Sequence, residues 1–149
     1  MSVGTICNRE VVIVEGKASI QEAAGLMRKY HVGCLIAAEQ RNGQNYPIGI
    51  LTDRDIVIEL VAKEVAIDSV TVADVMSLQL TLARENDDLI ETLKQMRHKG
   101  IRRMPVVDDQ GVLIGLITVD DLLELLAEQL KDLAGLIVRE QQSEVKAHP

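Results

Sequence analysis

The chain has 149 residues, of which 47% are hydrophobic, and a formal net charge of −7. This length suits one domain with a hydrophobic core, or two half-sized units that share an interface. The acidic balance excludes nucleic acids as the main partner, because their phosphates are also negative. No apolar run approaches the roughly 20 residues that a membrane-spanning helix needs, and Met1–Gly4 lacks the basic start of a signal peptide. We therefore expect a cytoplasmic protein with no membrane partner.

Residues 1–69 predict the order strand, helix, strand, strand, helix. Apolar runs bounded by turn residues predict strands at Val11–Val14, Gly33–Ala38 and Ile48–Leu51. Apolar residues at helical spacing predict a helix from Ile20 to about Tyr30, which Ser19 and Glu22 begin as a capping box. Arg41-Asn42-Gly43 supplies a hairpin turn, and a second helix opens at Asp53–Asp55.

Residues 70–130 predict the same order again. Strands are expected at Leu80–Leu82, Met104–Val107 and Leu113–Ile117. The intervening helix is capped by Asn86 or Asp87 and runs to about Lys99. The last helix opens at Val119–Asp121, and its amphipathic pattern over Leu122–Arg139 is longer than in the first repeat. We expect the excess to pack on a second copy or another partner, and the polar Glu140–Pro149 to fray.

The two halves are one pattern written twice. A shift of 69 positions aligns Val3–Ala38 with Val72–Val107, and a shift of 66 aligns Pro47–Ile56 with Leu113–Leu122. We therefore predict an α/β (α+β) fold of two β-α-β-β-α repeats, each too small to stand alone. The predicted boundaries are 1–69 for the first repeat, 70–130 for the second, and 131–149 for a C-terminal helix extension and tail.

A signature that occurs twice and one basic run point to a known family. The pattern G-h-h-T-x-x-D-h, in which h is hydrophobic, occurs at Gly49–Ile56 and again at Gly115–Leu122. Together with the run Gly100–Asp108, it resembles the cystathionine-β-synthase (CBS) domain over residues 3 to 128. The resemblance implies two repeats packed through their sheets with pseudo-two-fold symmetry, as in a stand-alone Bateman module. It also implies a homodimer, a regulated protein partner, and clefts that bind AMP, ADP, ATP, S-adenosylmethionine or NAD.

The repeated Thr and Asp suit a ribose. Thr52 and Thr118 follow a strand with a hydroxyl that can meet ribose or phosphate. Asp55 and Asp121 stand in the first turn of the next helix, where the helix dipole favours a carboxylate that can accept both ribose hydroxyls. The alternative is that these residues are helix caps, and the two roles are compatible. Gly49 and Gly115, which precede these residues in the two copies, indicate that the end of each strand passes close to another group.

Arg102 and Arg103 form a local basic cluster in an acidic chain. Adjacent guanidinium groups suit phosphate oxygens; the alternative is ion pairing with surface carboxylates. The first repeat has the uncharged Gly33 and Cys34 at the matching positions, so the two sites are expected to be unequal. Arg54, which aligns with Asp120 of the second repeat, is expected to supply part of the positive charge that Gly33 and Cys34 lack.

The adenine needs an apolar slot, for which the candidates are also ordinary core positions. They are Val12 and Leu35 (with Val11) in one site, and Leu80, Met104 and Pro105 in the other. Thr5 and Asp74, which match each other, are candidates for contact with the base or ribose, and Mg²⁺ is a candidate companion of a polyphosphate. Neither Cys7 nor Cys34 belongs to a C-x-x-C pair, so we expect free thiols and no zinc site.

These residues predict a non-catalytic sensor that binds an adenine nucleotide and signals to a partner protein. One alternative is a structural or interaction module whose clefts are vestigial, which the uncharged Gly33-Cys34 pair favours for the first site. Another is an enzyme acting on nucleotides, which no nucleophile with a neighbouring base supports.

Overall fold

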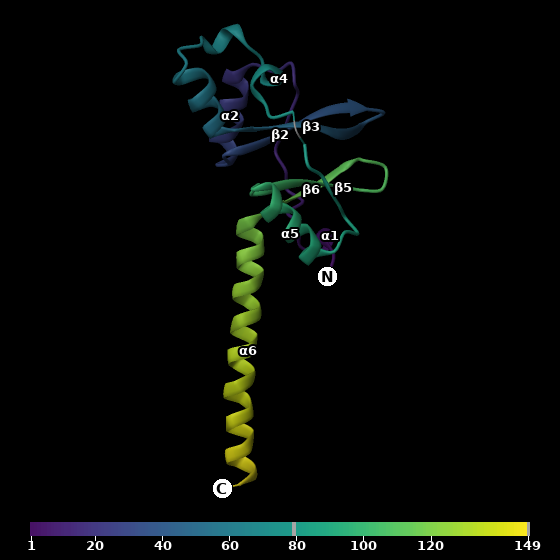
Figure 1. The fold of residues 1–149 in the computed structure, drawn as a ribbon, viewed down its shortest axis with the longest axis vertical. Coiled ribbons are helices and arrows are strands. Elements are labelled where there is room, and N and C mark those ends of the chain that lie inside the picture. Colours follow the sequence, from purple (N-terminus) through teal and green to yellow (C-terminus); the bar gives the residue numbers. More distant parts are fainter. Residues whose placement is uncertain (79, 149) are drawn as a thin grey trace. The chain divides into compact units, whose positions relative to one another are not determined.

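The computed structural model describes residues 1–78 and 80–148 (Figure 1). They fall into two compact units, Met1–Ile117 and Thr118–Pro149. The elements in chain order are α1 (Val3–Ile6), β1 (Ile13–Val14), α2 (Ile20–Tyr30), β2 (Cys34–Arg41), β3 (Gln44–Thr52), α3 (Asp53–Ile56), a π-helical turn η1 (Val57–Val61), a 3-10 turn η2 (Ile67–Ser69), α4 (Val72–Val75), β4 (Ala83–Arg84), α5 (Leu89–Lys99), β5 (Arg103–Val107), β6 (Leu113–Thr118) and α6 (Val119–Ala147). The predicted mixed α/β class is confirmed.

Two three-stranded sheets have the same order, β1-β2-β3 and β4-β5-β6. In the first, β1 pairs parallel to β2, and β2 pairs antiparallel to β3. The hairpin turn is as predicted, because Asn42 and Gly43 both have positive φ, at 51° and 79°. Strands β2 and β3 extend beyond the predicted apolar runs, because polar residues continue the pairing until Arg41 pairs with Gln44.

Several predicted boundaries are wrong by a few residues. The first strand is shorter than Val11–Val14, and the fourth lies just after the predicted Leu80–Leu82. Ser19 caps α2, accepting from Glu22 N at 3.0 Å, which is one of the two bonds of the predicted capping box. The cap of α5 is Asp88, which accepts from Glu91 N at 3.1 Å, and not Asn86 or Asp87. Asp87 instead closes the preceding turn by accepting from Arg84 N at 2.9 Å.

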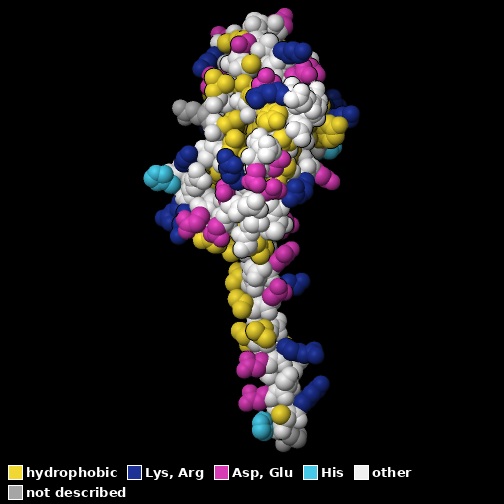
Figure 2. Space-filling view, turned by 90° about the vertical axis from the view of Figure 1, so that its right-hand side faces the viewer, with side chains coloured by type: hydrophobic (Ala, Val, Ile, Leu, Met, Phe, Trp, Pro, Cys, Tyr) yellow, Lys and Arg dark blue, Asp and Glu magenta, His cyan; other side chains and the backbone are white. Residues whose placement is uncertain are grey.

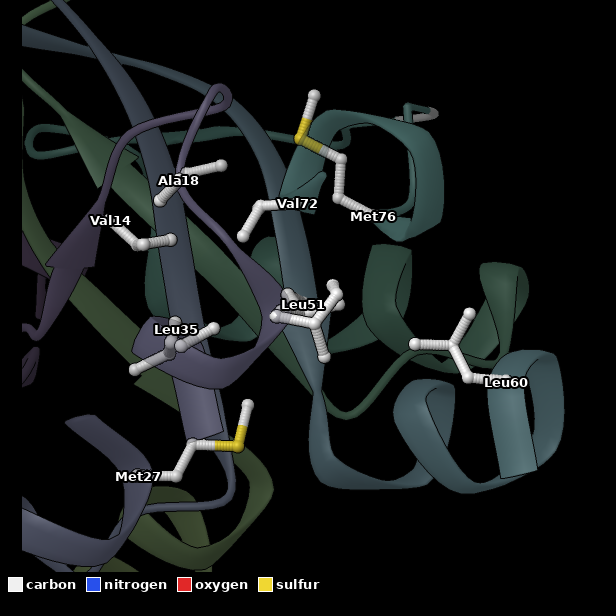
Figure 3. Close-up of a cluster of buried hydrophobic side chains, with 11 residues drawn as sticks. Val14, Ala18, Met27, Leu35, Leu51, Leu60, Val72 and Met76 are labelled. Carbon is white, nitrogen blue, oxygen red and sulfur yellow. The ribbon is translucent and has the colours of Figure 1, made fainter. Parts of the chain in front are cut away.

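The opening segment of the second repeat packs on the first repeat's sheet. Val72 N donates to Ala18 O at 3.0 Å, and Ser77 exchanges two backbone hydrogen bonds with Ile50, at 2.9 and 3.3 Å. Val72 and Met76 lie in the buried core cluster formed otherwise by residues 14–60 (Figure 3). The short helix α4, which the sequence did not predict, is therefore part of the first core.

The opening segment of the first repeat makes the matching contacts with the second sheet. Val3 N donates to Asp87 O at 2.9 Å, and Asn8 exchanges two backbone hydrogen bonds with Leu116, at 2.9 and 2.8 Å. All of these residues are the 69- or 66-position counterparts of those in the other contact. Each repeat thus completes its sheet with the other's opening segment, so neither core is built from one repeat alone.

The last helix, α6, is 29 residues long and continues to Ala147. The expected fraying of Glu140–Pro149 is therefore wrong for residues 140–147, whose Glu, Gln, Lys, Val and Ala residues are compatible with helix. Leu122 is buried, whereas most of the later apolar side chains of α6 are exposed. In the described part of the chain, no helix combines the length and the hydropathy needed to cross a membrane.

Candidate functional site

Each repeated Thr-x-x-Asp closes the first turn of a helix. Thr52 N donates to Asp55 Oδ2 at 2.9 Å, and Asp55 N donates to Thr52 Oγ1 at 3.1 Å. In the second unit, Thr118 and Asp121 make the same two bonds at 3.1 and 3.2 Å. The capping role is therefore confirmed for both pairs, and each carboxylate keeps a second oxygen.

A third Thr-x-x-Asp shows that this spacing alone does not mark a ligand site. Thr71 N donates to Asp74 Oδ2 at 2.8 Å in another capping box, at the start of α4. Thr5, at the matching position of α1, donates its hydroxyl proton to Ser2 O at 2.6 Å. Thr5 and Asp74 thus make hydrogen bonds within their own short helices, α1 and α4.

The glycines of the repeated signature, Gly49 and Gly115, leave room for the opening segment of the other repeat. A Cβ on Gly49 would lie 3.0 Å from Ser77 O, and a Cβ on Gly115 would lie 2.8 Å from Asn8 O. Both distances are too short for a side chain without movement of the neighbouring backbone. The close neighbour expected from the sequence is therefore the protein's own chain.

The capping box of α3 opens onto a pocket of about 260 Å³, which we call the arginine pocket. Thr52 reaches it from the end of β3 and Asp55 from α3, whereas Arg102 and Arg103 reach it from the start of β5 and the residue before it. The full lining is Ile50, Thr52, Asp55, Ser77, Leu80, Thr81, Ile101, Arg102 and Arg103. The structure thus brings together five of the residues singled out from the sequence.

Neither arginine of this pocket is neutralised. Arg102 is exposed and Arg103 is half-buried. Among the described residues the ion pairs are formed elsewhere, and neither guanidinium has a carboxylate oxygen within 4.0 Å. The alternative of surface ion pairing is therefore wrong for these two residues.

Cys34 lies in the electrostatic reach of this pocket. Burial raises the pKa of its thiol, and Asp55 and Asp53 raise it further, whereas Arg103 acts to lower it. The charge of Arg103, the first residue of β5, therefore acts on the thiol of Cys34, the first residue of β2 and its counterpart at the 69-position shift.

A second pocket, of about 540 Å³, is the repeat counterpart of the first; we call it the tyrosine pocket. Its residues Asn8, Val11, Val12 and Val32 match Ser77, Leu80, Thr81 and Ile101 of the arginine pocket at the 69-position shift. The remaining lining residues are Glu10, Ile13, Leu26 and Tyr30. Among the residues that the structure describes, no Lys or Arg lines it, which agrees with the expected inequality of the two sites.

Other predicted site residues line neither pocket. Leu35, Met104 and Pro105 are fully buried in the core. Arg54 is exposed, with its backbone N–H bound to Asp53 Oδ1 at 2.8 Å. Thr118, Asp120 and Asp121 belong to the second unit. Roles for these residues in binding stay predictions.

Ser77, Thr81 and Tyr30 line the pockets but were not predicted from the sequence. Ser77 and Thr81 could have been found as neighbours of Leu80 in the segment between the repeats, and Tyr30 as one of only two aromatic residues. Among the described residues there is no cluster of three or more His, Cys, Asp or Glu side chains that could hold a metal ion.

Comparison with known proteins points to one family. The family model of the CBS domain matches residues 3–62 and 72–128. The chain is 36% identical over 122 residues to the CBS domain-containing protein YhcV of Bacillus subtilis, covering 81% of this chain and 82% of that protein. It is 37% identical over 125 residues to an uncharacterized protein of Methanopyrus kandleri, covering 84% of this chain but only 62% of that protein. A CBS domain protein of Pyrobaculum aerophilum, solved with AMP, has the same fold, with a TM-score of 0.72, 24% identity, and coverage of 85% and 99%.

Proposed function

Because the chain belongs to the CBS domain family and carries two such domains, we propose that it is a regulatory module that binds an adenine nucleotide in the arginine pocket. The observation that carries this proposal is the pair of unneutralised guanidinium groups beside a capping carboxylate in one hollow. Two cations at a pocket wall suit the oxygens of a phosphate. A CBS domain protein of the same fold holds AMP.

The proposed ligand lies with its ribose at α3 and its phosphate at β5. Asp55 Oδ2 is occupied by Thr52 N, but its Oδ1 makes no hydrogen bond with the described residues. That free oxygen is the proposed acceptor for a ribose hydroxyl, and the Thr52 hydroxyl is a proposed donor to the ligand. Leu80 and Ile101 supply apolar surface for the base, and Arg102 and Arg103 receive the phosphate.

The module is proposed to work without catalysis. The histidines, at positions 31, 98 and 148, do not line the arginine pocket, so its walls offer no imidazole base to Ser77 or Thr52. Its output is a change of conformation or assembly in a homodimer, passed to a separate regulated protein, which requires the ligand to bind one state better than the other. The cytoplasmic location and a Mg²⁺ companion stay predictions.

The deciding experiment is a thermal-shift series with adenosine, AMP, ADP, ATP, NAD, S-adenosylmethionine and GTP at millimolar concentration. A ligand at about 100 times its Kd adds roughly 2.7 kcal/mol to the free energy of unfolding. We expect a rise in Tm with adenine nucleotides and none with GTP. A flat series would instead favour the interaction module with vestigial clefts.

The carboxylate is tested by Asp55→Asn, which keeps an oxygen for the cap and removes the charge. We expect weaker AMP binding with a nearly unchanged Tm of the free protein. Asp88→Asn is the matched control, because Asp88 caps α5 and lines neither pocket. Equal AMP affinity in both variants would contradict the ribose assignment.

A further inference from the structure

The two guanidinium groups of the arginine pocket select a phosphate but not a base. Arg102 and Arg103 suit the phosphate of any nucleotide, and acidic and basic side chains are interspersed over the face of the first unit that Figure 2 shows. Leu80 and Ile101 offer the base only apolar surface. A preference for adenine therefore needs hydrogen-bonding groups on the pocket wall, because a base that does not match such groups leaves them unpaired.

The two sheets differ by one hydrogen bond beside the pockets. In the first repeat, Ile36 N donates to Val12 O at 3.0 Å, at the residue just before β1. The counterparts of Ile36 and Val12 at the 69-position shift are Pro105 and Thr81. Because proline has no N–H, this hydrogen bond cannot form in the second repeat, and β4 begins at Ala83, one position later than β1 does.

Pro105 stands where a proline is unusual. The strand β5 is the middle strand of its sheet, between β4 and β6, and Pro105 is fully buried in it. Prolines in sheets are mostly confined to edge strands, because a proline in a middle strand cannot donate to the strand beside it. Here the carbonyl oxygen that lacks a donor belongs to Thr81, and Thr81 lines the arginine pocket.

The main chain of Thr81 has no partner in the part of the chain that the structure describes. Neither its N–H nor its carbonyl oxygen forms a hydrogen bond with residues 1–78 or 80–148. Its side chain is held, because Lys99 Nζ donates to Thr81 Oγ1 at 3.2 Å. Thr81 is half-buried, and backbone groups that are withdrawn from water require partners. A ligand in the arginine pocket can supply them.

An adenine carries the complementary groups. Its exocyclic amine donates, and the ring nitrogens on either side of that amine accept. We propose that the adenine of the ligand pairs with the main chain of Thr81, at the position that Pro105 leaves open. The amine donates to Thr81 O, and a ring nitrogen accepts from Thr81 N–H. This assignment rests on the proposed binding of an adenine nucleotide in the arginine pocket and names the groups that recognise its base.

The tyrosine pocket cannot recognise a base in this way. Val12 lines it, but the carbonyl oxygen of Val12 already accepts from Ile36 N. Pro105 therefore adds a second difference between the two pockets, in hydrogen bonding, to the difference in charge that Arg102 and Arg103 make.

The first test compares AMP with purine riboside 5′-monophosphate, which lacks only the amine, by titration calorimetry of the wild-type chain. We expect AMP to bind about tenfold more tightly, since one hydrogen bond to an otherwise unpaired carbonyl oxygen contributes up to about that factor. Equal affinities would overturn the pairing with Thr81 and leave the proposed function intact. A chain that binds neither compound would overturn the proposed function, and this assignment with it.

The second test restores the missing donor. Pro105→Ala provides an N–H that can donate to Thr81 O, as Ile36 N does to Val12 O. We expect the affinity for AMP to fall about tenfold, to that of purine riboside 5′-monophosphate, whose own affinity changes little. The matched control is Pro47→Ala, which removes a proline from β3 that lines neither pocket. A Pro105→Ala variant that melts cooperatively and still prefers AMP would overturn the assignment, as would an equal loss in the control.

The third test needs no variant and follows the amide hydrogen of Thr81 by NMR. In the free protein this amide should exchange quickly, and saturating AMP should slow its exchange by about tenfold or more, because a ring nitrogen then accepts it. Exchange at Thr81 that stays unchanged while AMP is bound would contradict the pairing.

Discussion

The two pockets differ in charge although the chain builds them from matching positions. The arginine pocket has two guanidinium groups, whereas the tyrosine pocket has Tyr30 and Glu10 and no Lys or Arg. At the positions of the arginines, the first repeat carries Gly33 and Cys34, and a Cβ on Gly33 would lie 2.9 Å from Asp53 Oδ2. Matching positions thus contribute to two hollows, of which only the one that Arg102 and Arg103 line has cationic walls among the described residues.

The largest expected effect is on the free energy of unfolding, when a signature glycine beside the other repeat's opening segment is replaced. In Gly49→Ala the added Cβ would lie 2.8 Å from Met76 Cγ and 3.0 Å from Ser77 O, so we expect a loss of about 1–3 kcal/mol in the free energy of unfolding, with damage to the arginine pocket. Gly115→Ala should cost a similar amount beside Asn8. Chemical denaturation measures both.

Gly25→Ala is the control for these variants. Gly25 lies inside α2, and a Cβ added there would have no neighbouring atom within 4 Å, so alanine should stabilise the protein by about 0.5–1 kcal/mol. A Gly49→Ala variant as stable as Gly25→Ala would show that the opening segment of the other repeat can move away.

The next effect separates phosphate from nucleoside. Replacing Arg102 and Arg103 with Ala should weaken AMP binding by about 100-fold or more, since each hydrogen bond to a charged group contributes a net of roughly 1.5–3 kcal/mol and a factor of ten corresponds to about 1.4 kcal/mol. Adenosine affinity should change little. Calorimetry with both ligands measures the ratio, and an equal loss for both would remove the arginines from the phosphate role.

A smaller effect, on the number of AMP molecules bound by each chain, tests whether the two pockets are unequal. Because only one pocket is cationic, we expect one strong AMP site in each chain and no comparable second site. Titration calorimetry gives the stoichiometry directly. Two AMP sites of similar affinity would show that the tyrosine pocket recruits its phosphate partner from residues outside its present lining, and Tyr30→Ala would then identify that site.

The smallest effect is on the Cys34 thiol. Burial raises its pKa, so the unfolded chain ionises first as pH rises, and this contribution to stability is lost at alkaline pH. Arg103→Ala removes the one group that lowers the pKa, so alkylation of Cys34 should shift to still higher pH. Arg102→Ala is the control, with no shift expected; equal profiles for both variants would contradict the coupling between β2 and β5.

Local patterns in the sequence determined much of this protein. The spacing of apolar residues set α2 at Ile20–Tyr30, Asn42-Gly43 set the hairpin turn, and the repeated Gly-x-x-Thr-x-x-Asp set both helix starts. The resemblance that these residues carry agrees with the family match. Such features depend on neighbours within a few residues, so propensity and capping chemistry reveal them.

Only the tertiary structure decided how the repeats combine. Because the segments that hold α1 and α4 each pack on the other repeat's sheet, Ser77 lies beside Ile50. Thr52 and Arg102, which are fifty residues apart in the chain, line the same pocket. Leu35 and Met104, which the sequence had offered to a ligand, are fully buried in the core. These outcomes follow from covering two small apolar faces that neither repeat can bury alone, and no local pattern records which distant segment provides the cover.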